Sequence, residues 1–466
     1  MDDDVILYWN DIALEANRVS HSNGKMEQDG PPRSARALAL VHLAMYDAFV
    51  GAAAVSGAES PGGHYLAAAD LPAAPPAGAS VDAAVAAAAY AVLFDLFPSQ
   101  RPFFDLIYDP TYSPVGVAAA GVADGRAYGA AVAGKLLTKR MGDPGASPLD
   151  YKPQTGRGKH RPDPDNPTQS FHAPKYGAEA TLFATTERFQ LAAPPAPSTG
   201  PGDYRRALRQ VRGKGIAPEL MGTVTPASRR RDENETIIGL YWAYDGAFGL
   251  GTPPRLYNQI LRLVAKYHPH SGPGGAINTP AQNARLFALA NVAMADAGIL
   301  AWEQKYRPDF EFWRPVLGIR EHDPSMGPEG VAGSDLDPDG DSGWLPLGAP
   351  LTNKLGKNFT PPFPAYPSGH ATFSAAAFHV ARRFYGVAAN DRGPDDLFTK
   401  ADGTNLSFVS EELNGVNTDN TGAVRPRHVR EFDDGLWKMI IENGLSRIYL
   451  GAVSYTHLTL PTICSV

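Results

Sequence analysis

The stretch FTPPFPAYPSGHATFSAAAFHVARRFYG, residues 359–386, joins a proline- and glycine-rich loop to an alanine-rich segment. We expect the second part to form a helix that begins near His370, with Ser368 and Gly369 just before it. A helix N-terminus has unpaired backbone N–H groups and a partial positive charge, so it attracts anions. Ser368 can add a hydroxyl donor, and Gly369 permits close backbone approach. Taken alone, this motif is more often an ordinary capped helix.

Composition excludes some classes of partner. The chain has 466 residues, of which 43% are hydrophobic, and its net charge is −7 with both signs mixed. This pattern gives no indication of a nucleic-acid partner. A run of three arginines at 229–231 is followed at once by acidic residues, so we interpret it as a solvated helix start.

Cysteine content and hydropathy limit the possibilities further. Cys464 is the only cysteine, so no internal disulfide or cysteine-based zinc site can form. The acidic N-terminus MDDDVILYWND lacks the pattern of a secretory signal. The longest uncharged apolar run, residues 83–94, is shorter than the ~20 residues that a spanning helix needs. We therefore expect a soluble protein with no membrane partner.

Hydrophobic periodicity predicts a mainly α fold. The expected helices cover roughly 34–54, 80–97, 115–140, 234–247, 254–267, 280–305, 370–386 and 430–451. The helix at 280–305 has a strong start signal: Thr279 as the cap, Pro280 at the first position and Gln282 three residues after the cap. Alternating β-branched runs are nearly absent, so few strands are expected.

Proline- and glycine-rich segments at 141–178 and 190–203 suggest a link between two helical halves. We predict an N-terminal helical domain over 1–200 and a C-terminal helical bundle over 201–453 that carries an anion site. The loop from about 319 to 367 is longer than a plain connection requires, and loops of that length are often functional.

Further cations join the histidine as candidates. Arg314 follows an aromatic cluster, and Lys305 and Arg307 lie upstream of it. Arg447 lies near the C-terminus on the same predicted helix face as Leu436 and Ile440. A guanidinium on such an apolar face needs a bound anion, or its side chain must extend to water. Asp245, in LYWAYDG, is a candidate partner for Arg447, although a turn role is equally consistent.

Each of these signals is weak alone, because arginines stack on aromatic rings and helices carry capping residues in many proteins. Together, a lysine, two arginines, a serine–glycine backbone and a histidine suit one tetrahedral oxyanion such as phosphate or vanadate. Arginine forks match its oxygens in pairs. No carboxylate cluster with magnesium spacing accompanies them.

The motifs resemble those of the vanadium-dependent haloperoxidases, and of their chloroperoxidase-like members in particular. This family shares its anion site with type 2 phosphatidic acid phosphatases and bacterial acid phosphatases. The resemblance rests on ALANVAMADAGILAWEQKY (288–306), FEFWRPVLGIRE (310–321), PPFPAYPSGHATF (361–373), ELNGVN (412–417) and GLSRIYLG (444–451). A weaker likeness covers WNDIALEA (9–16) and PPRSARALALVHLAMYDAF (31–49).

The resemblance implies two α-helical bundles and a vanadate cofactor at the base of the second. It also implies oxidation of halide by hydrogen peroxide to hypohalous acid, which attacks a small organic acceptor. By position, the residues implied to hold vanadate are Lys305, Arg314, Ser368, Gly369, His370 and Arg447. His370 would be the acid–base residue, with Lys305 beside it in catalysis. Trp302 and Phe363 would lie near the halide, and Asp245 would support the site.

The sequence departs from the family pattern between the lysine and the arginine. Six residues separate them in the family, whereas eight separate Lys305 from Arg314 here, and Pro308 interrupts them. Arg307 has the ordinary spacing to Arg314, but the upstream match of DAGILAW favours Lys305. We therefore expect Lys305 to face the site and Pro308 to begin a bulge.

The second departure concerns the vanadium-bonding histidine, which the family places six residues after the last arginine. That position here is Val453, and the nearest histidine is His457. The segment VSYTHLTLPTICSV matches nothing in the family, and we interpret 454–466 as a foreign tail that leaves activity impaired.

Two other functions use the same residues. A phosphomonoesterase would take the missing histidine as its nucleophile and His370 as the acid for the leaving group. A non-catalytic oxyanion-binding protein is the third possibility.

Overall fold

The computed structural model describes residues 3–108, 121–143, 151–191, 193, 201–270, 274–323, 325–326 and 339–455. Its longer helices are α1 (Val5–Ser20), α2 (Gly30–Ser56), α3 (Val81–Leu96), α4 (Arg101–Tyr108), α5 (Val122–Lys139), α7 (Pro201–Lys214), α8 (Glu233–Tyr241), α9 (Pro253–Tyr267), α10 (Pro280–Lys305), α12 (Gly369–Phe384) and α13 (Gly435–Tyr449). The shorter ones are α6 (Tyr176–Glu179), α11 (Pro315–Glu321), η1 (Pro98–Gln100), η2 (Pro218–Thr223), η3 (Ala227–Arg229) and η5 (Glu411–Leu413). The mainly α fold is therefore confirmed.

A small antiparallel ribbon accompanies the helices. It pairs β1 (Ser407–Val409) with β2 (Val429–Glu431), with Phe408 opposite Arg430. The expected helix at 430–451 therefore begins later, at Gly435. The side chain of Asp395 accepts hydrogen bonds from the backbone N–H groups of Leu436 and Trp437, which sets this start.

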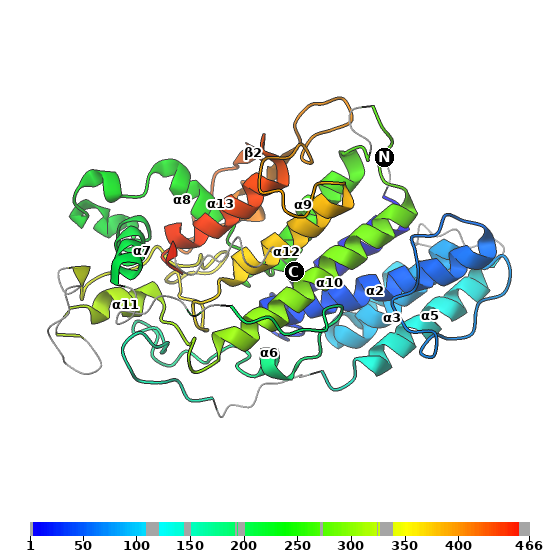
Figure 1. Cartoon of the computed structure of the whole chain (residues 1–466), viewed down its shortest axis with the longest axis horizontal. Coiled ribbons are helices and arrows are strands. Elements are labelled where there is room, and N and C mark those ends of the chain that lie inside the picture. Colours follow the sequence, from blue (N-terminus) through cyan, green and yellow to red (C-terminus); the bar gives the residue numbers. More distant parts are fainter. Residues whose placement is uncertain are drawn as a thin grey trace.

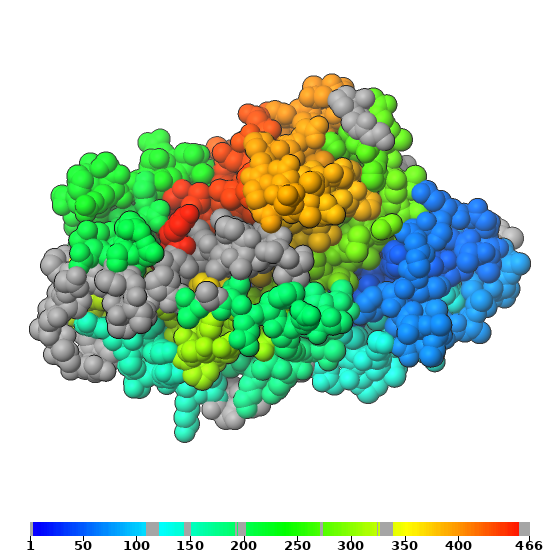
Figure 2. Space-filling view, in the orientation of Figure 1, coloured from blue at the N-terminus to red at the C-terminus, as the bar shows by residue number. Residues whose placement is uncertain are grey.

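The helices lie side by side along one long axis, with α2, α3 and α5 at one end and α7 and α11 at the other (Figure 1). In the space-filling view the blue N-terminal residues form one end of the molecule and the green residues of α7 and α8 lie at the opposite end (Figure 2). Helix α10 packs against α2 on one side and against α12 on the other. It therefore connects the N-terminal helices to the region of the predicted site.

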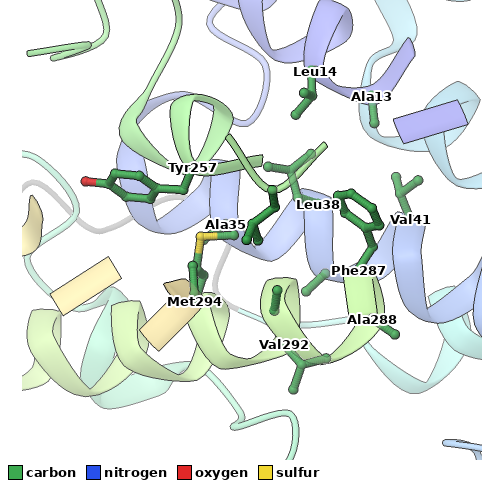
Figure 3. Packing of buried hydrophobic residues seen from close by; sticks show 14 of the residues in the cluster. Ala13, Leu14, Ala35, Leu38, Val41, Tyr257, Phe287, Ala288, Val292 and Met294 are labelled. Atoms are coloured by element: carbon green, nitrogen blue, oxygen red, sulfur yellow. The ribbon is translucent and has the colours of Figure 1, made fainter. Parts of the chain in front are cut away.

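One hydrophobic cluster runs through both halves of the chain. Figure 3 shows Leu38 and Val41 of α2 on either side of the Phe287 ring of α10, with Tyr257 of α9 in the same cluster. The predicted division near residue 200 stays a prediction, since the described core is shared between the segments before and after it.

The start of α10 confirms the capping prediction. Gln282 N–H donates to Thr279 Oγ1, and Thr279 N–H donates to Gln282 Oε1. Further along, Gly298 permits the close approach of α10 and α12, because a Cβ there would lie 2.6 Å from the ring of Phe373. This contact fixes α12 against the end of α10 that carries Lys305.

Several sequence-based predictions were wrong in detail. Helix α8 ends at Tyr241 rather than near 247, because Tyr244 and Gly246 adopt positive φ angles. Residues 115–120 of one expected helix lie outside the described residues, and α1, α4 and α7 were not among the helices expected from periodicity. Arg231 is buried rather than solvated, and it donates to the carbonyl of Ile216 at 2.9 Å and to that of Tyr449 at 3.2 Å.

By length and composition, two helices, α2 and α10, are long and apolar enough to cross a membrane. The search for the longest uncharged apolar run, which gave residues 83–94, did not detect them. That search ended at the few charged residues that each of these two helices contains. In the structure, 83% and 78% of their most apolar windows are buried. Packing within the protein thus accounts for their composition.

A candidate oxyanion site

Three cations from separate elements meet in one small pocket. Lys305 ends α10, Arg314 caps the N-terminus of α11, and Arg447 lies in the last turn of α13. All three line a cavity of about 20 Å³. This volume suits a water molecule or a small inorganic ion, whereas organic ligands occupy roughly 300–1,000 Å³.

Lys305, not Arg307, lies in the pocket lining. Its ammonium donates to the carbonyl of Pro364 at 2.9 Å and also to that of Pro367. Burial, reinforced by Arg314, holds the pKa of Lys305 well below its usual value. Arg307 instead forms an ion pair with Asp309 at 2.8 Å, beyond the end of α10.

Arg314 is held by backbone carbonyls and retains a free donor. Its Nε donates to Phe363 O at 2.8 Å, and its Nη1 donates to Ala452 O at 2.9 Å. Its Nη2 is buried and has no hydrogen-bond partner within the described chain. Burial, with a further contribution from Arg447, lowers the pKa of Arg314 to about 9. An anion in the pocket would accept a hydrogen bond from Nη2 and would also stabilise the charged form of Arg314.

Arg447 is paired with Asp245, as the sequence suggested. Its Nη2 donates to both carboxylate oxygens of Asp245, at 2.7 and 2.8 Å. Its Nη1 is buried and, over the residues that the structure describes, unpartnered. One carboxylate thus faces three cations, and the lining keeps a surplus of positive charge.

The N-terminus of α12 forms another wall of the pocket. Ser368 is its cap, and Ser368, Gly369 and His370 all line the cavity. A β-carbon on Gly369 would lie 3.4 Å from the ring of Trp302. The start of the helix therefore lies beside the cations, and the unpaired backbone N–H groups of a helix N-terminus commonly bind an anion.

His370 is oriented by the backbone of another segment. Its Nε2 lies 2.6 Å from Ala243 O. Because a carbonyl can only accept, Nε2 carries the proton and Nδ1 is the nitrogen that can take up another. Burial, together with repulsion from Arg447, lowers the pKa of His370 to about 3. The imidazole is therefore neutral near pH 7 unless an anion enters.

An aromatic pair covers the same pocket. The rings of Trp302 and Phe363 lie 4.9 Å apart, and both residues line the cavity. Lys305 Nζ lies 5.4 Å from the Trp302 ring and 5.2 Å from the Phe363 ring. These rings keep water away from the cations, which strengthens any charge interaction there.

Val453 completes the lining at the position that the resemblance assigns to a histidine. It is buried, and its N–H donates to Arg447 O at 3.2 Å. The bond from Arg314 Nη1 to Ala452 O holds the same segment in place. His457 lies outside the described residues.

Sequence reasoning missed several residues of the lining. Pro31 lies in the first turn of α2 and Pro253 begins α9, and both reach the pocket, as do Pro361 and Phe373. The motif PPRSARAL was noted only for its likeness to the family. Nothing in it signalled that the start of α2 lies beside α12.

This donor set fits vanadate or another tetrahedral oxyanion. Two guanidinium N–H groups are buried and unsatisfied within the described residues, and a helix N-terminus with a serine hydroxyl lies beside them. Within the same part of the chain, no group of three or more His, Cys, Asp or Glu side chains is arranged to hold a metal cation. The pocket thus supplies donors and positive charge.

Buried neutral histidines make stability depend on pH. Burial lowers the pKa of His42 to about 4 and that of His370 to about 3, whereas unfolded histidine titrates near 6.5. Between pH ~6.5 and ~4 the unfolded chain binds more protons, so stability falls as pH falls, by at most ~1.4 kcal/mol per unit for each group. We expect a lower urea midpoint at pH 5 than at pH 7.5. An equal or higher midpoint at pH 5 would contradict this linkage.

Comparisons with known proteins agree with this chemistry. Residues 1–174 match the family described as the vanadium chloroperoxidase N-terminal domain, and residues 285–455 match its second helical-bundle domain. A vanadium chloroperoxidase from Curvularia inaequalis is 38% identical, over 96% of this chain and 78% of the relative.

Solved structures show a similar fold. The first bacterial vanadium-dependent iodoperoxidase superposes with a TM-score of 0.61 at 19% identity, covering 98% of this chain and 95% of that structure. A holo-type bacterial vanadium-dependent chloroperoxidase gives a TM-score of 0.61 at 14% identity, covering 96% and 92% respectively. At these identities the likeness concerns the fold alone.

Proposed function

Because the chain belongs to the vanadium haloperoxidase family, we propose that it oxidises halide with hydrogen peroxide to hypohalous acid, using vanadate bound in the pocket between α10, α12 and α13. A small organic acceptor would then take up the halogen. The observation that carries this proposal is the surplus of buried cations in a cavity sized for one small ion. Buried charge without a counter-ion is costly, so such a site is built for an anion.

The residues proposed to hold vanadate are Lys305, Arg314, Ser368, Gly369, His370 and Arg447. Arg314 Nη2 and Arg447 Nη1 have no hydrogen-bond partner among the described residues, so both are ready donors to its oxygens. Asp245 fixes Arg447 through two hydrogen bonds and balances part of the charge. When bound, vanadate supplies the Lewis-acid centre at which hydrogen peroxide becomes reactive toward a halide.

His370 is proposed as the acid–base residue. Its Nε2–H is committed to Ala243 O, so a proton from peroxide would be taken up at Nδ1. An anion beside His370 would raise the pKa of its imidazole from about 3, because the bound negative charge offsets Arg447. The imidazole would then be able to exchange protons at working pH.

Trp302 and Phe363 are proposed to lie beside the halide. Their rings form an apolar wall next to the cations. A large, weakly hydrated halide loses little hydration energy when it lies against such a surface. The Trp302 indole N–H is also buried without an acceptor among the described residues, so it is available as a donor.

A matched pair of substitutions tests the site. Lys305→Met should weaken vanadate binding by about 10- to 150-fold, the equivalent of a lost charge-assisted hydrogen bond of ~1.5–3 kcal/mol. Arg307→Met removes a cation two residues away that pairs with Asp309 outside the lining, and it should leave affinity unchanged. Equilibrium dialysis with vanadate measures both.

Peroxide-dependent bromination of a phenolic dye provides the second readout for the same pair. Loss of affinity and bromination in Lys305→Met alone would support the proposal. Equal behaviour of the two variants, or loss only in Arg307→Met, would contradict it. Circular dichroism at a fixed temperature shows that each variant is folded.

A further inference from the structure

A second, larger cavity system lies along α10 and α12, apart from the oxyanion pocket. One cavity of about 430 Å³ and another of about 560 Å³ share Leu289 of α10 and Val380 of α12 in their linings. The two cavities therefore lie next to each other, and we call them together the groove. None of the pocket cations Lys305, Arg314 or Arg447 lines it.

The first part of the groove is apolar. Val292, Ala293, Ala297 and Leu300 of α10 recur at helical spacing along its floor, and Ala376 of α12 faces them. Small alanine side chains leave room above the two helices where larger residues would close the groove. A lining of this kind, at about 430 Å³, matches the size and chemistry of sites for small organic ligands.

The wall of this apolar part is fixed by specific hydrogen bonds. Gln304 of α10 accepts from Leu191 N at 2.7 Å and donates to Phe189 O at 3.1 Å. Asp296 accepts from three successive backbone N–H groups, those of residues 183–185. The segment that borders the groove is thus held in place by the helix that forms its floor.

The other part of the groove carries positive charge. Arg285 of α10 and Arg383 of α12 both line it, one on each side. Neither guanidinium lies in an ion pair with a described residue, and Arg383 donates only to the backbone carbonyl of Val387. Glu59 lines the same part of the groove without forming an ion pair with either arginine in the described structure.

We infer that this groove binds an amphiphilic carboxylate, with the acid at Arg285 and Arg383 and the apolar body between α10 and α12. Two guanidiniums without an ion-pair partner among the described residues match a carboxylate in charge. Arg285 and Leu300 are separated by about 22 Å along the helix axis, enough for an extended alkyl chain. This inference goes beyond the proposed peroxidase activity and does not depend on it.

Laurate is the test ligand, and dodecyltrimethylammonium is its matched control, with the same chain and the opposite charge. Isothermal titration of the full chain, below micelle concentrations, should show one laurate bound and at least tenfold weaker binding of the cation. Arg285→Gln combined with Arg383→Gln should weaken laurate binding at least tenfold. Ala293→Phe should abolish it by filling the floor.

The control for the double variant is Lys357→Gln with Arg427→Gln, which removes the same charge at exposed positions outside the groove. Its laurate affinity should equal that of the unmodified chain. If Ala293→Phe does not fold, the laurate affinity of the Arg285→Gln/Arg383→Gln variant still tests the inference, because both arginines are exposed. Laurate affinity that survives both groove variants, or equal binding of the two amphiphiles, would overturn the inference.

Sedimentation velocity tests whether a second copy of this chain, rather than a carboxylate, occupies the groove. A dimer that dissociates in the groove variants, in a protein that does not bind laurate, would assign the groove to another copy of this chain and also overturn the inference. Bromination activity should be unchanged in Arg285→Gln/Arg383→Gln, because neither residue lines the oxyanion pocket.

Discussion

Replacing Val453 with histidine should raise vanadate affinity by at least ~10-fold and increase bromide oxidation with it. Val453 is buried in the lining of the oxyanion pocket, and its backbone is held by Arg447 O and by the neighbouring bond from Arg314. A valine side chain has no lone pair, whereas an imidazole at this position adds a direct ligand. Even indirect partners of a metal ligand are worth about 10–100-fold in affinity, so a direct ligand should reach at least that range.

The matched control is Val453→Gln, which adds comparable bulk and polarity without an imidazole. Both changes enlarge a buried side chain, so each is expected to cost about 1–3 kcal/mol of stability. Vanadate titration and bromination are compared in the two variants at equal folded concentration. Equal affinity and rate in both would show that the position is not a ligand site. Strong bromination by the unmodified chain, unchanged in Val453→His, would show that the chain already has the ligand it needs.

His370→Ala should lower peroxidase turnover by about 10²–10⁴-fold, the usual contribution of a positioned acid–base group. Vanadate affinity should change far less, because the Lys305, Arg314 and Arg447 side chains and the start of α12 remain. The substitution leaves Ala243 O without its partner at 2.6 Å, so a stability loss of about 1–3 kcal/mol is also expected. Turnover is therefore measured where the variant is fully folded.

His379→Ala is the control for His370→Ala. His379 lies on the same helix, has the same 8% exposure, and does not line the oxyanion pocket. Measuring both variants with Val453 and with Val453→His separates proton transfer from cofactor retention. Turnover lost equally in both histidine variants would indicate general damage to α12. Unchanged turnover in His370→Ala would remove His370 from the proposed acid–base role.

The positions of most of the long helices could be predicted because the signals for them are local. Thr279, Pro280 and Gln282 identified the start of α10, and the alanine-rich stretch after His370 identified α12. Helix α1 was not among the helices expected from periodicity, and the start of α13 was misplaced because it depends on Asp395, 41 residues before Leu436. A cap supplied from so far away leaves no pattern in the local sequence.

The sequence by itself determined the mainly α fold, the family and the types of residue at the anion site. Periodicity, caps and ordered motifs are sufficient for those, because each depends on neighbours within a few turns. Tertiary structure decided which side chains meet: Lys305 enters the pocket because α10 ends there, while Arg307 turns to Asp309. It also decided between the two roles that the sequence left open for Asp245, which pairs with Arg447 across 202 residues, and it placed Ala243 O against His370. These contacts follow from how distant helices close around one core, which no local pattern specifies.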